Sequence, residues 1–215
     1  MRKVNYYIVR HGETLLNKLG KAQGWVDSPL TDSGIRTAQR LKEKLEGISF
    51  ASVYSSDLQR AYQTAKIISK ETKNIQIDPR LREWCLGRLE AEPTPIFLNE
   101  ILSELHDIST EDLNLHLPEV CNTIHQIDTT GMTETFDGIA CRLKECLEDI
   151  GYQALNAGGG NVLIVTHAFI IKTIVYLFDY DKLKSISKIA NTSVTKICFD
   201  GKQFVLEYSN MVYPK

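Results

Sequence analysis

The sequence VRHGET at residues 9–14 decides the fold that this chain is expected to adopt. It closes a short apolar run, residues 6–9, which predicts a buried strand. An arginine followed by a histidine is unfavourable in an apolar core, because both side chains can carry positive charge. The sequence therefore indicates either a surface turn with an incidental histidine or a binding site for an anion, and the choice depends on the rest of the chain.

The composition is typical of a soluble globular protein. Of the 215 residues, 43% are hydrophobic and 24% are charged, so we expect a single domain with a sizeable core. The net charge of −2 provides no basic field, which argues against a nucleic-acid partner. No apolar run is long enough for a signal peptide or a membrane span, so we expect a cytoplasmic protein with no membrane partner. The sequence leaves open whether the chain forms a homodimer.

The cysteines and several histidines indicate neither a disulfide framework nor a metal site. The five cysteines are odd in number and scattered without a C-x-x-C pair, so we interpret them as small hydrophobic side chains. Three histidines of an acidic region are spaced ten and nine residues apart, which does not match the short ligand pairs of zinc sites. These residues are Cys85, Cys121, Cys141, Cys146 and Cys198, and His106, His116 and His125.

Strand and helix patterns alternate towards both ends of the chain. Strands are expected at residues 4–9, 51–54, 75–77 and 161–166, followed by a hairpin of 194–199 and 204–208. Helices are expected over residues 31–45, 58–68, 136–150 and 170–178. Thr31 offers an N-cap to the first helix, and Ser55-Ser56-Asp57 to the second. This alternation predicts an α/β fold, with an open, mostly parallel sheet and helices on both faces.

Residues 89–141 differ from the rest, because they contain no lysine or arginine although aspartate and glutamate recur. Pro93, Pro95 and Pro118 interrupt the region, and its leucine and isoleucine pairs indicate short helices. We interpret residues 89–135, approximately, as a helical cap inserted into a single domain of residues 1–215. The acidic residues form either a solvated face or, if the cap closes over a pocket, a source of negative potential.

Three of the predicted strands end near histidine or arginine side chains. Arg10 and His11 follow the first strand, His167 follows the strand at 161–166, and Arg60 begins the helix after the strand at 51–54. Ligands of open α/β sheets bind beyond the carboxyl ends of the strands, so we expect these side chains to form one pocket. Two guanidinium groups suit a phosphate dianion, because each can pair with two oxygens at once.

A phosphate ester bound in this pocket needs a nucleophile and a proton donor. Histidine can form a covalent intermediate, and arginines rather than a metal ion would neutralise the developing charge. Glu83 is one candidate donor, because its neighbour Trp84 is apolar and would favour the protonated carboxyl group. Spacing alone leaves that role open. It also leaves open whether Trp25 and Trp84 line the substrate or only pack.

Five motifs together resemble those of the histidine phosphatase superfamily, in particular its phosphoglycerate-mutase-like branch. They are RHGET with Asn17, QGWVDSPLT at 23–31, VYSSDLQRAYQTA at 53–65, LREWCLG at 81–87 and VTHA at 165–168, and the resemblance covers nearly the whole chain. It implies that His11 is the phosphorylated nucleophile and that Glu83 is the proton donor. The residues implied to bind phosphate or substrate are Arg10, Asn17, Gln23, Gly24, Arg60, His167 and Ala168.

The chain departs from the family pattern at three places. Ala168-Phe169 stands where relatives often carry glycines, which puts a bulkier side chain near the phosphate or the leaving group. Leu89-Glu90-Ala91 replaces a tryptophan-glutamate-glycine run, and Thr133-Glu134-Thr135 replaces a glycine-glutamate-serine helix start. None of these changes alters a residue implied in catalysis.

We expect the activity to be hydrolysis of a small-molecule phosphomonoester without a cofactor. A cofactor-dependent phosphoglycerate mutase is the alternative, but it must hold a bisphosphorylated compound, and residues 89–141 supply no cation for it. The acidic cap favours a substrate whose organic part is neutral, apolar or cationic. A catalytically inactive binding or regulatory protein is the alternative of another class. It would be expected to lack one of Arg10, His11, Arg60, Glu83 and His167, all of which are present.

Overall fold

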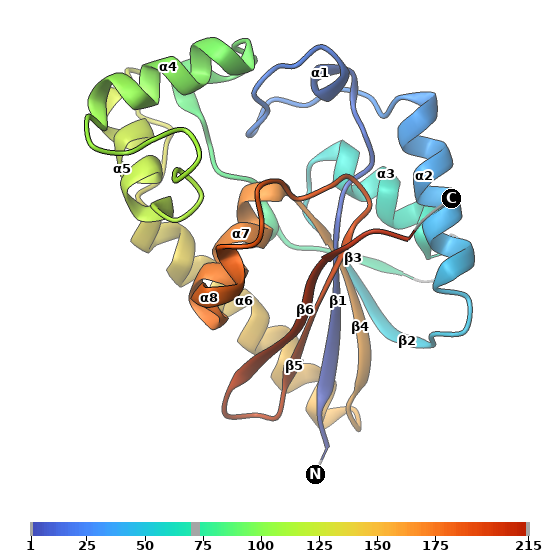
Figure 1. The fold of residues 1–215 in the computed structure, drawn as a ribbon. Coiled ribbons are helices and arrows are strands. Elements are labelled where there is room, and N and C mark those ends of the chain that lie inside the picture. The colour runs from blue at the N-terminus through green and yellow to red at the C-terminus, as the bar shows by residue number, and fades with distance from the viewer. Residues whose placement is uncertain (1, 70–73, 214–215) are drawn as a thin grey trace.

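A six-stranded sheet organises the computed structural model, which describes residues 2–69 and 74–213 (Figure 1). The strands are β1 (Val4–Arg10), β2 (Phe50–Ser55), β3 (Ile75–Ile77), β4 (Gly160–Thr166), β5 (Val194–Phe199) and β6 (Phe204–Met211). Their order is β3-β2-β4-β1-β5-β6. The first four run parallel, and β5 and β6 add an antiparallel edge. The predicted open, mostly parallel sheet is confirmed.

Helices cover both faces of the sheet, as the sequence predicts. They are α1 (Leu15–Lys18), α2 (Asp32–Lys44), α3 (Gln59–Ile68), α4 (Thr94–Glu104), α5 (Leu117–Ile127), α6 (Phe136–Asn156), α7 (Ala168–Phe178) and α8 (Tyr180–Leu183), with 3₁₀ turns η1 (Pro79–Leu81) and η2 (Gly87–Leu89). Side chains alternate along β4. Val162 and Ile164 pack into the core shared with α6 and α7, whereas Leu163 and Val165 pack against α2 and α3.

The start of α2 agrees with the sequence, but the start of α3 does not. Thr31 Oγ1 accepts a hydrogen bond from Gly34 N–H at 3.0 Å, which is the predicted N-cap. In the cap predicted for α3 at residues 55–57, Ser56 Oγ accepts a hydrogen bond from Leu58 N–H at 3.2 Å, but no side chain of this triplet caps the first turn of the helix. Asp27 Oδ2 instead accepts from Gln59 N–H at 2.5 Å. Asp27 comes from a loop more than thirty positions away, so the local sequence could not reveal it.

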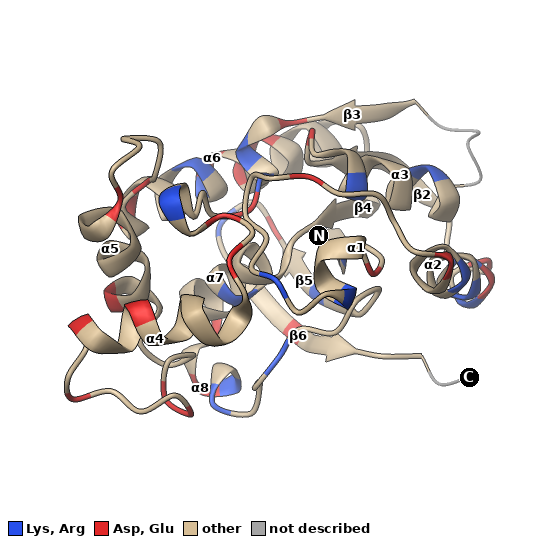
Figure 2. Ribbon diagram, turned by 90° about the horizontal axis from the view of Figure 1, so that it is seen from above, with Lys and Arg blue, Asp and Glu red and all other residues tan. Residues whose placement is uncertain are grey.

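The acidic helices α4 and α5 lie between η2 and α6 in the chain, on the side of the molecule towards which β1 and β4 run (Figure 1). Acidic residues are scattered over both helices and the segment that joins them (Figure 2). Glu104, Asp107 and Glu111 among them are exposed. We refer to residues 89–135 below as the cap.

The register of the central strands brings the expected site residues together. Arg10 of β1 pairs with Thr166 of β4 in parallel register, so His11 and His167 follow neighbouring strands at the same level. Ser55 at the end of β2 pairs with Val165, which places the loop before α3 beside them. Among residues 2–69 and 74–213, no helix is both long enough and apolar enough to cross a membrane. All five cysteines are free thiols.

Candidate active site

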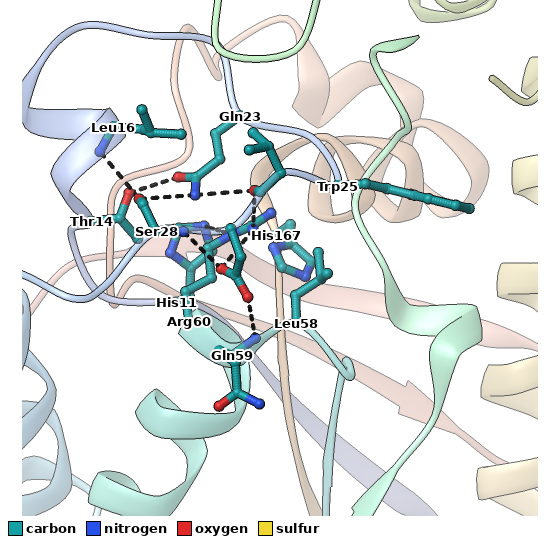
Figure 3. A network of polar contacts seen from close by, with 12 residues as sticks. His11, Thr14, Leu16, Gln23, Trp25, Ser28, Leu58, Gln59, Arg60 and His167 are labelled. Carbon is teal, nitrogen blue, oxygen red and sulfur yellow. Dashed lines mark hydrogen bonds and ion pairs between the residues drawn. The ribbon is translucent and has the colours of Figure 1, made fainter. Parts of the chain in front are cut away.

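His11 is buried at the end of β1, and its Nε2 accepts a hydrogen bond from Arg60 Nε (Figure 3). Its Nδ1 lies 2.8 Å from the carbonyl oxygen of Gly12. Because a carbonyl only accepts, this contact assigns the ring hydrogen to Nδ1 and leaves a lone pair on Nε2. Arg60 Nε lies 3.3 Å from that Nε2, and the His167 ring centre is 5.2 Å from the ring centre of His11.

Burial keeps both histidines neutral. It lowers the pKa of His11 and of His167 well below the ordinary value, and the charges of Arg60 and Arg10 lower both further. A neutral imidazole with an unprotonated Nε2 is the form in which histidine can act as a nucleophile. The surroundings of His11 favour this form.

His167 has one ring nitrogen without a protein partner. Its Nε2 lies 2.9 Å from Ser56 Oγ, which also accepts from Leu58 N–H at 3.2 Å. His167 Nδ1 and Arg10 Nε are both buried, and neither has a hydrogen-bond partner within the described part of the chain. Because the guanidinium nitrogen is a donor, an unsatisfied Arg10 Nε beside His11 suits an anionic ligand.

The two arginines are fixed by backbone carbonyls. Arg60, which is fully buried, donates to Gly24 O at 2.5 Å and to Val26 O at 2.9 Å, and it pairs with Asp27 at 3.1 Å. Arg10 Nη1 donates to the carbonyl oxygen of Ile189 at 2.6 Å. Burial lowers the pKa of Arg10 to about 10, which leaves it charged at neutral pH. The site thus holds two fixed positive charges.

The carboxyl group of Glu83 lies at the N-terminus of α7. Its Oε1 accepts from Trp84 N–H at 3.0 Å and from Ile170 N–H at 3.2 Å, and its Oε2 accepts from Phe169 N–H at 3.0 Å. Burial raises the pKa of Glu83, although these amides and the charges of Arg60 and Arg10 oppose the shift. A buried carboxyl group that retains its proton can serve as a general acid.

The remaining residues implied to bind substrate are placed less directly. Gly24 serves Arg60 through its carbonyl, and Ala168 is the first residue of α7, directly after His167. The side chain of Gln23 forms hydrogen bonds with Thr14, Val26 and Ser28. The side-chain amide of Asn17 donates a further hydrogen bond to Gln23. Figure 3 shows this network above His11, with the Trp25 ring pointing away from the two histidines. These side chains shape the loop that carries the Arg60 acceptors.

Glu90 organises the same loop, a role that sequence reasoning did not identify. One carboxylate oxygen accepts from Trp25 N–H at 2.6 Å and Leu86 N–H at 3.0 Å, and the other from Gly24 N–H at 3.0 Å and Val26 N–H at 3.2 Å. Three charge-assisted hydrogen bonds therefore fix the loop that provides acceptors for Arg60, and the fourth joins it to Leu86. The only signal for this role in the sequence was that Leu89-Glu90-Ala91, which departs from the family's tryptophan-glutamate-glycine run, keeps the glutamate.

We expect Glu90→Ala to lower the free energy of unfolding by about 3 kcal/mol, because the variant leaves buried backbone amides without an acceptor. The melting temperature should fall by about 6–12 °C. The value of kcat/KM should fall about tenfold or more, since Gly24 O and Val26 O would no longer fix Arg60. Calorimetry and steady-state kinetics check both effects. Glu92→Ala is the matched control, and an unchanged kcat/KM in Glu90→Ala would contradict the positioning role.

Two further positioning residues were also missed. Asn191 Nδ2 donates to the carbonyl oxygen of His11 at 3.0 Å and to Asn17 Oδ1 at 3.3 Å. Arg142 pairs with Glu134 and donates to the carbonyl oxygen of Glu83 at 3.4 Å. Both act on backbone distant in sequence, so no motif marks them.

The aromatic residues near Glu83 mainly pack. Trp84 is buried, stacks on Phe169 with ring centres 4.7 Å apart, and donates its indole N–H to Thr173. Trp25 donates its indole N–H to the carbonyl oxygen of Glu83 at 2.8 Å and lies beneath the Arg82 guanidinium. In the described ranges, no cluster of three or more histidine, cysteine or carboxylate side chains could hold a metal ion.

Comparisons with known proteins agree with the fold and with the motifs. Residues 6–212 match the histidine phosphatase superfamily (branch 1). Phosphoglycerate mutase-like protein 4 of Arabidopsis thaliana is 30% identical over 204 residues, which cover 93% of this chain and 82% of the relative.

Two solved structures extend the likeness to three dimensions. Phosphoglycerate mutase from Bacillus anthracis str. Sterne has a TM-score of 0.92 at 32% identity, covering 98% of this chain and 94% of that one. Phosphoserine phosphatase from Entamoeba histolytica, in complex with 3-phosphoglyceric acid, has a TM-score of 0.72 at 26% identity and 97% coverage of each chain. The chain therefore belongs to the histidine phosphatase superfamily, in its phosphoglycerate-mutase-like branch.

Proposed function

We propose that this protein is a phosphomonoesterase that hydrolyses a small-molecule phosphate ester through a phosphohistidine at His11. One observation carries the proposal: a neutral His11 with a free Nε2 lies beside Arg60, while the buried Glu83 has a raised pKa. These are the protonation states that a nucleophile and a general acid need at the same pH.

In the first step, His11 Nε2 attacks phosphorus, and a P–N bond forms as the P–O bond to the alcohol breaks. Arg10 and Arg60 neutralise the charge that develops on the phosphoryl oxygens. Glu83 gives its proton to the departing oxygen, so the alcohol leaves neutral. The carboxylate that remains is stabilised by the amides of Phe169 and Ile170 at the start of α7.

In the second step, water attacks phosphorus and the P–N bond breaks. The Glu83 carboxylate takes a proton from this water, and inorganic phosphate leaves. His11 is again neutral and Glu83 is again protonated, so the cycle needs no further reactant.

A screen of phosphorylated small molecules near neutral pH tests the proposal, with release of inorganic phosphate as the readout. Denaturing the enzyme during turnover should trap a phosphoryl group that is stable to alkali and labile to acid. Peptide mapping should place it on His11. Turnover without any such adduct would overturn the covalent mechanism.

We expect a chelator to leave kcat/KM on p-nitrophenyl phosphate within about twofold of its original value, because Arg10 and Arg60 supply the positive charge at the phosphoryl group. Steady-state assays with and without EDTA check this. A loss that added Mg²⁺ restores would contradict metal-independent catalysis.

Phosphoglycerate mutase activity is the second candidate function, and the likeness to the enzyme from Bacillus anthracis favours it. A mutase uses the same phosphohistidine, but a phosphoglycerate hydroxyl replaces water in the second step. Turnover of 3-phosphoglycerate in the presence of the bisphosphorylated cofactor distinguishes the two. Isomerisation faster than phosphate release would favour the mutase.

A further inference from the structure

A cavity of about 210 Å³ lies between the cap and α7. Apolar side chains of α4, α5 and the segment between them form most of its wall, and α7 closes the other side. The lining includes Phe97, Ile101, Leu113, Leu117, Phe169 and Lys172. The exposed acidic residues of the cap are not part of this lining. The negative potential that the sequence predicted over the pocket therefore has no source in the cavity wall.

Lys172 places an ammonium group in this apolar wall. Its residue is only 8% exposed. The Nζ contacts Asn114 Oδ1 and lies 3.4 Å from the carbonyl oxygen of Ser187. Both partners are neutral oxygens, so they solvate the ammonium without balancing its charge, and an ammonium has three hydrogens to donate. Burial lowers the pKa of Lys172 to about 8, which leaves the amine mostly protonated at neutral pH.

The cavity shares two structural elements with the catalytic centre. Phe169 lines the cavity with its side chain and donates its backbone N–H to Glu83. The segment 187–189 accepts hydrogen bonds from both sites. The carbonyl oxygen of Ser187 accepts from Lys172, and that of Ile189 accepts from Arg10. Arg10 lowers the pKa of Lys172, and Glu83 raises it when its carboxyl group is ionised. The cavity and the catalytic centre therefore adjoin each other at Phe169 and at segment 187–189.

We propose that this cavity binds the alcohol half of the substrate, and that Lys172 recognises a carboxylate separated from the ester oxygen by an apolar spacer. The inference rests on the proposed phosphomonoesterase function and specifies its substrate class. The apolar wall fits the spacer, and the single buried ammonium fits one terminal anion. The sequence-based expectation of a neutral, apolar or cationic alcohol half was based on the charges of the cap residues alone. Lys172, the cation that changes this expectation, belongs to α7.

Binding and hydrolysis test the two proposals separately. The first experiment measures Kd by titration calorimetry for ω-carboxyalkyl phosphonates of increasing chain length, each beside the alkyl phosphonate of equal length. We expect the carboxylated ligand of the best length to bind about ten- to a hundredfold more tightly, as a charged hydrogen bond requires. In Lys172→Met this preference should disappear, while Kd for the uncharged ligand stays within about twofold.

Lys184→Met is the matched control, because Lys184 is exposed, pairs with Asp181 and does not line the cavity. It should keep the full preference. In the wild-type protein the preference should decline between pH 7 and pH 9, as Lys172 loses its proton in the field of Glu83 and Arg10. Phosphonates are not hydrolysed, so this result does not depend on the activity.

Several results would overturn the inference. Equal Kd values for the two ligand series would do so, as would a preference that survives in Lys172→Met. Equal weakening of both series in that variant would assign Lys172 to the phosphoryl group instead. Hydrolysis of the corresponding phosphate esters is measured in parallel. Absence of hydrolysis with an intact binding preference would reject only the phosphomonoesterase function.

Discussion

Replacing His11 by alanine is expected to lower kcat on p-nitrophenyl phosphate by about 10⁴-fold or more, as the loss of a covalent nucleophile does in other enzymes. In the proposed mechanism, the Nε2 beside Arg60 is the atom that forms the P–N bond, and alanine offers no substitute. Stopped assays over long times, with radiolabelled substrate to detect a trapped adduct, measure both the rate and the intermediate.

The matched control for this prediction is His116→Ala. His116 is the residue before α5 and faces Glu119 on the cap surface, so its removal should change kcat by less than about twofold. Equal rates in the wild-type protein and in His11→Ala would support the alternative of a binding protein without catalysis.

Replacing Glu83 by glutamine is expected to produce a loss that depends on the leaving group. For alkyl phosphates, kcat should fall about 10²- to 10⁴-fold, because the departing alkoxide needs the proton of Glu83. For p-nitrophenyl phosphate the loss should be about tenfold or less, since this phenolate leaves readily without protonation. A plot of log kcat against leaving-group pKa should be much steeper for the variant than for the wild-type protein.

The pH profile provides an independent test of the same residue. The active form needs neutral His11 and protonated Glu83. The lowered pKa of His11 extends its neutral form to lower pH, and the raised pKa of Glu83 extends its protonated form to higher pH. Activity on alkyl phosphates should therefore fall as the pH rises through the raised pKa of Glu83. Glu83→Gln should lack this alkaline limb, and an unchanged limb would assign it to another group.

The fold could be predicted from the sequence because its signals are local. Alternating apolar residues and turn residues identified all six strands, since both depend on near neighbours in the chain. The start of α7 lies at Ala168, two residues before the predicted one, because His167 ends the strand and the helix begins directly after it. The capping side chain of α3 was not predicted for a different reason, since the amide of Gln59 is satisfied by the distant Asp27.

The candidate site likewise contains some residues that the sequence predicts and others that only the folded structure reveals. The rule that ligands bind at strand ends was enough to bring Arg10, His11, Arg60 and His167 together before any comparison. The role of Glu83 needed the resemblance, because its raised pKa depends on burial under α7. Glu90 and Lys172 were not predicted at all. Their functions depend on backbone and cavity walls that only the folded chain assembles.

The register between β1 and β4 has a consequence for how this enzyme can change. Arg10 of β1 pairs with Thr166 of β4, and His11 and His167 are the next residues after the two strands. The hydrogen bonds of the sheet therefore set the spacing of the two imidazole rings. The cap that lines the cavity is a separate stretch of chain and takes no part in that register. If the cavity binds the alcohol half of the substrate as proposed, mutations in residues 89–135 alter which alcohol is accepted without moving the reacting atoms. Selection on substrate choice and selection on chemistry thus act on different segments of this one polypeptide.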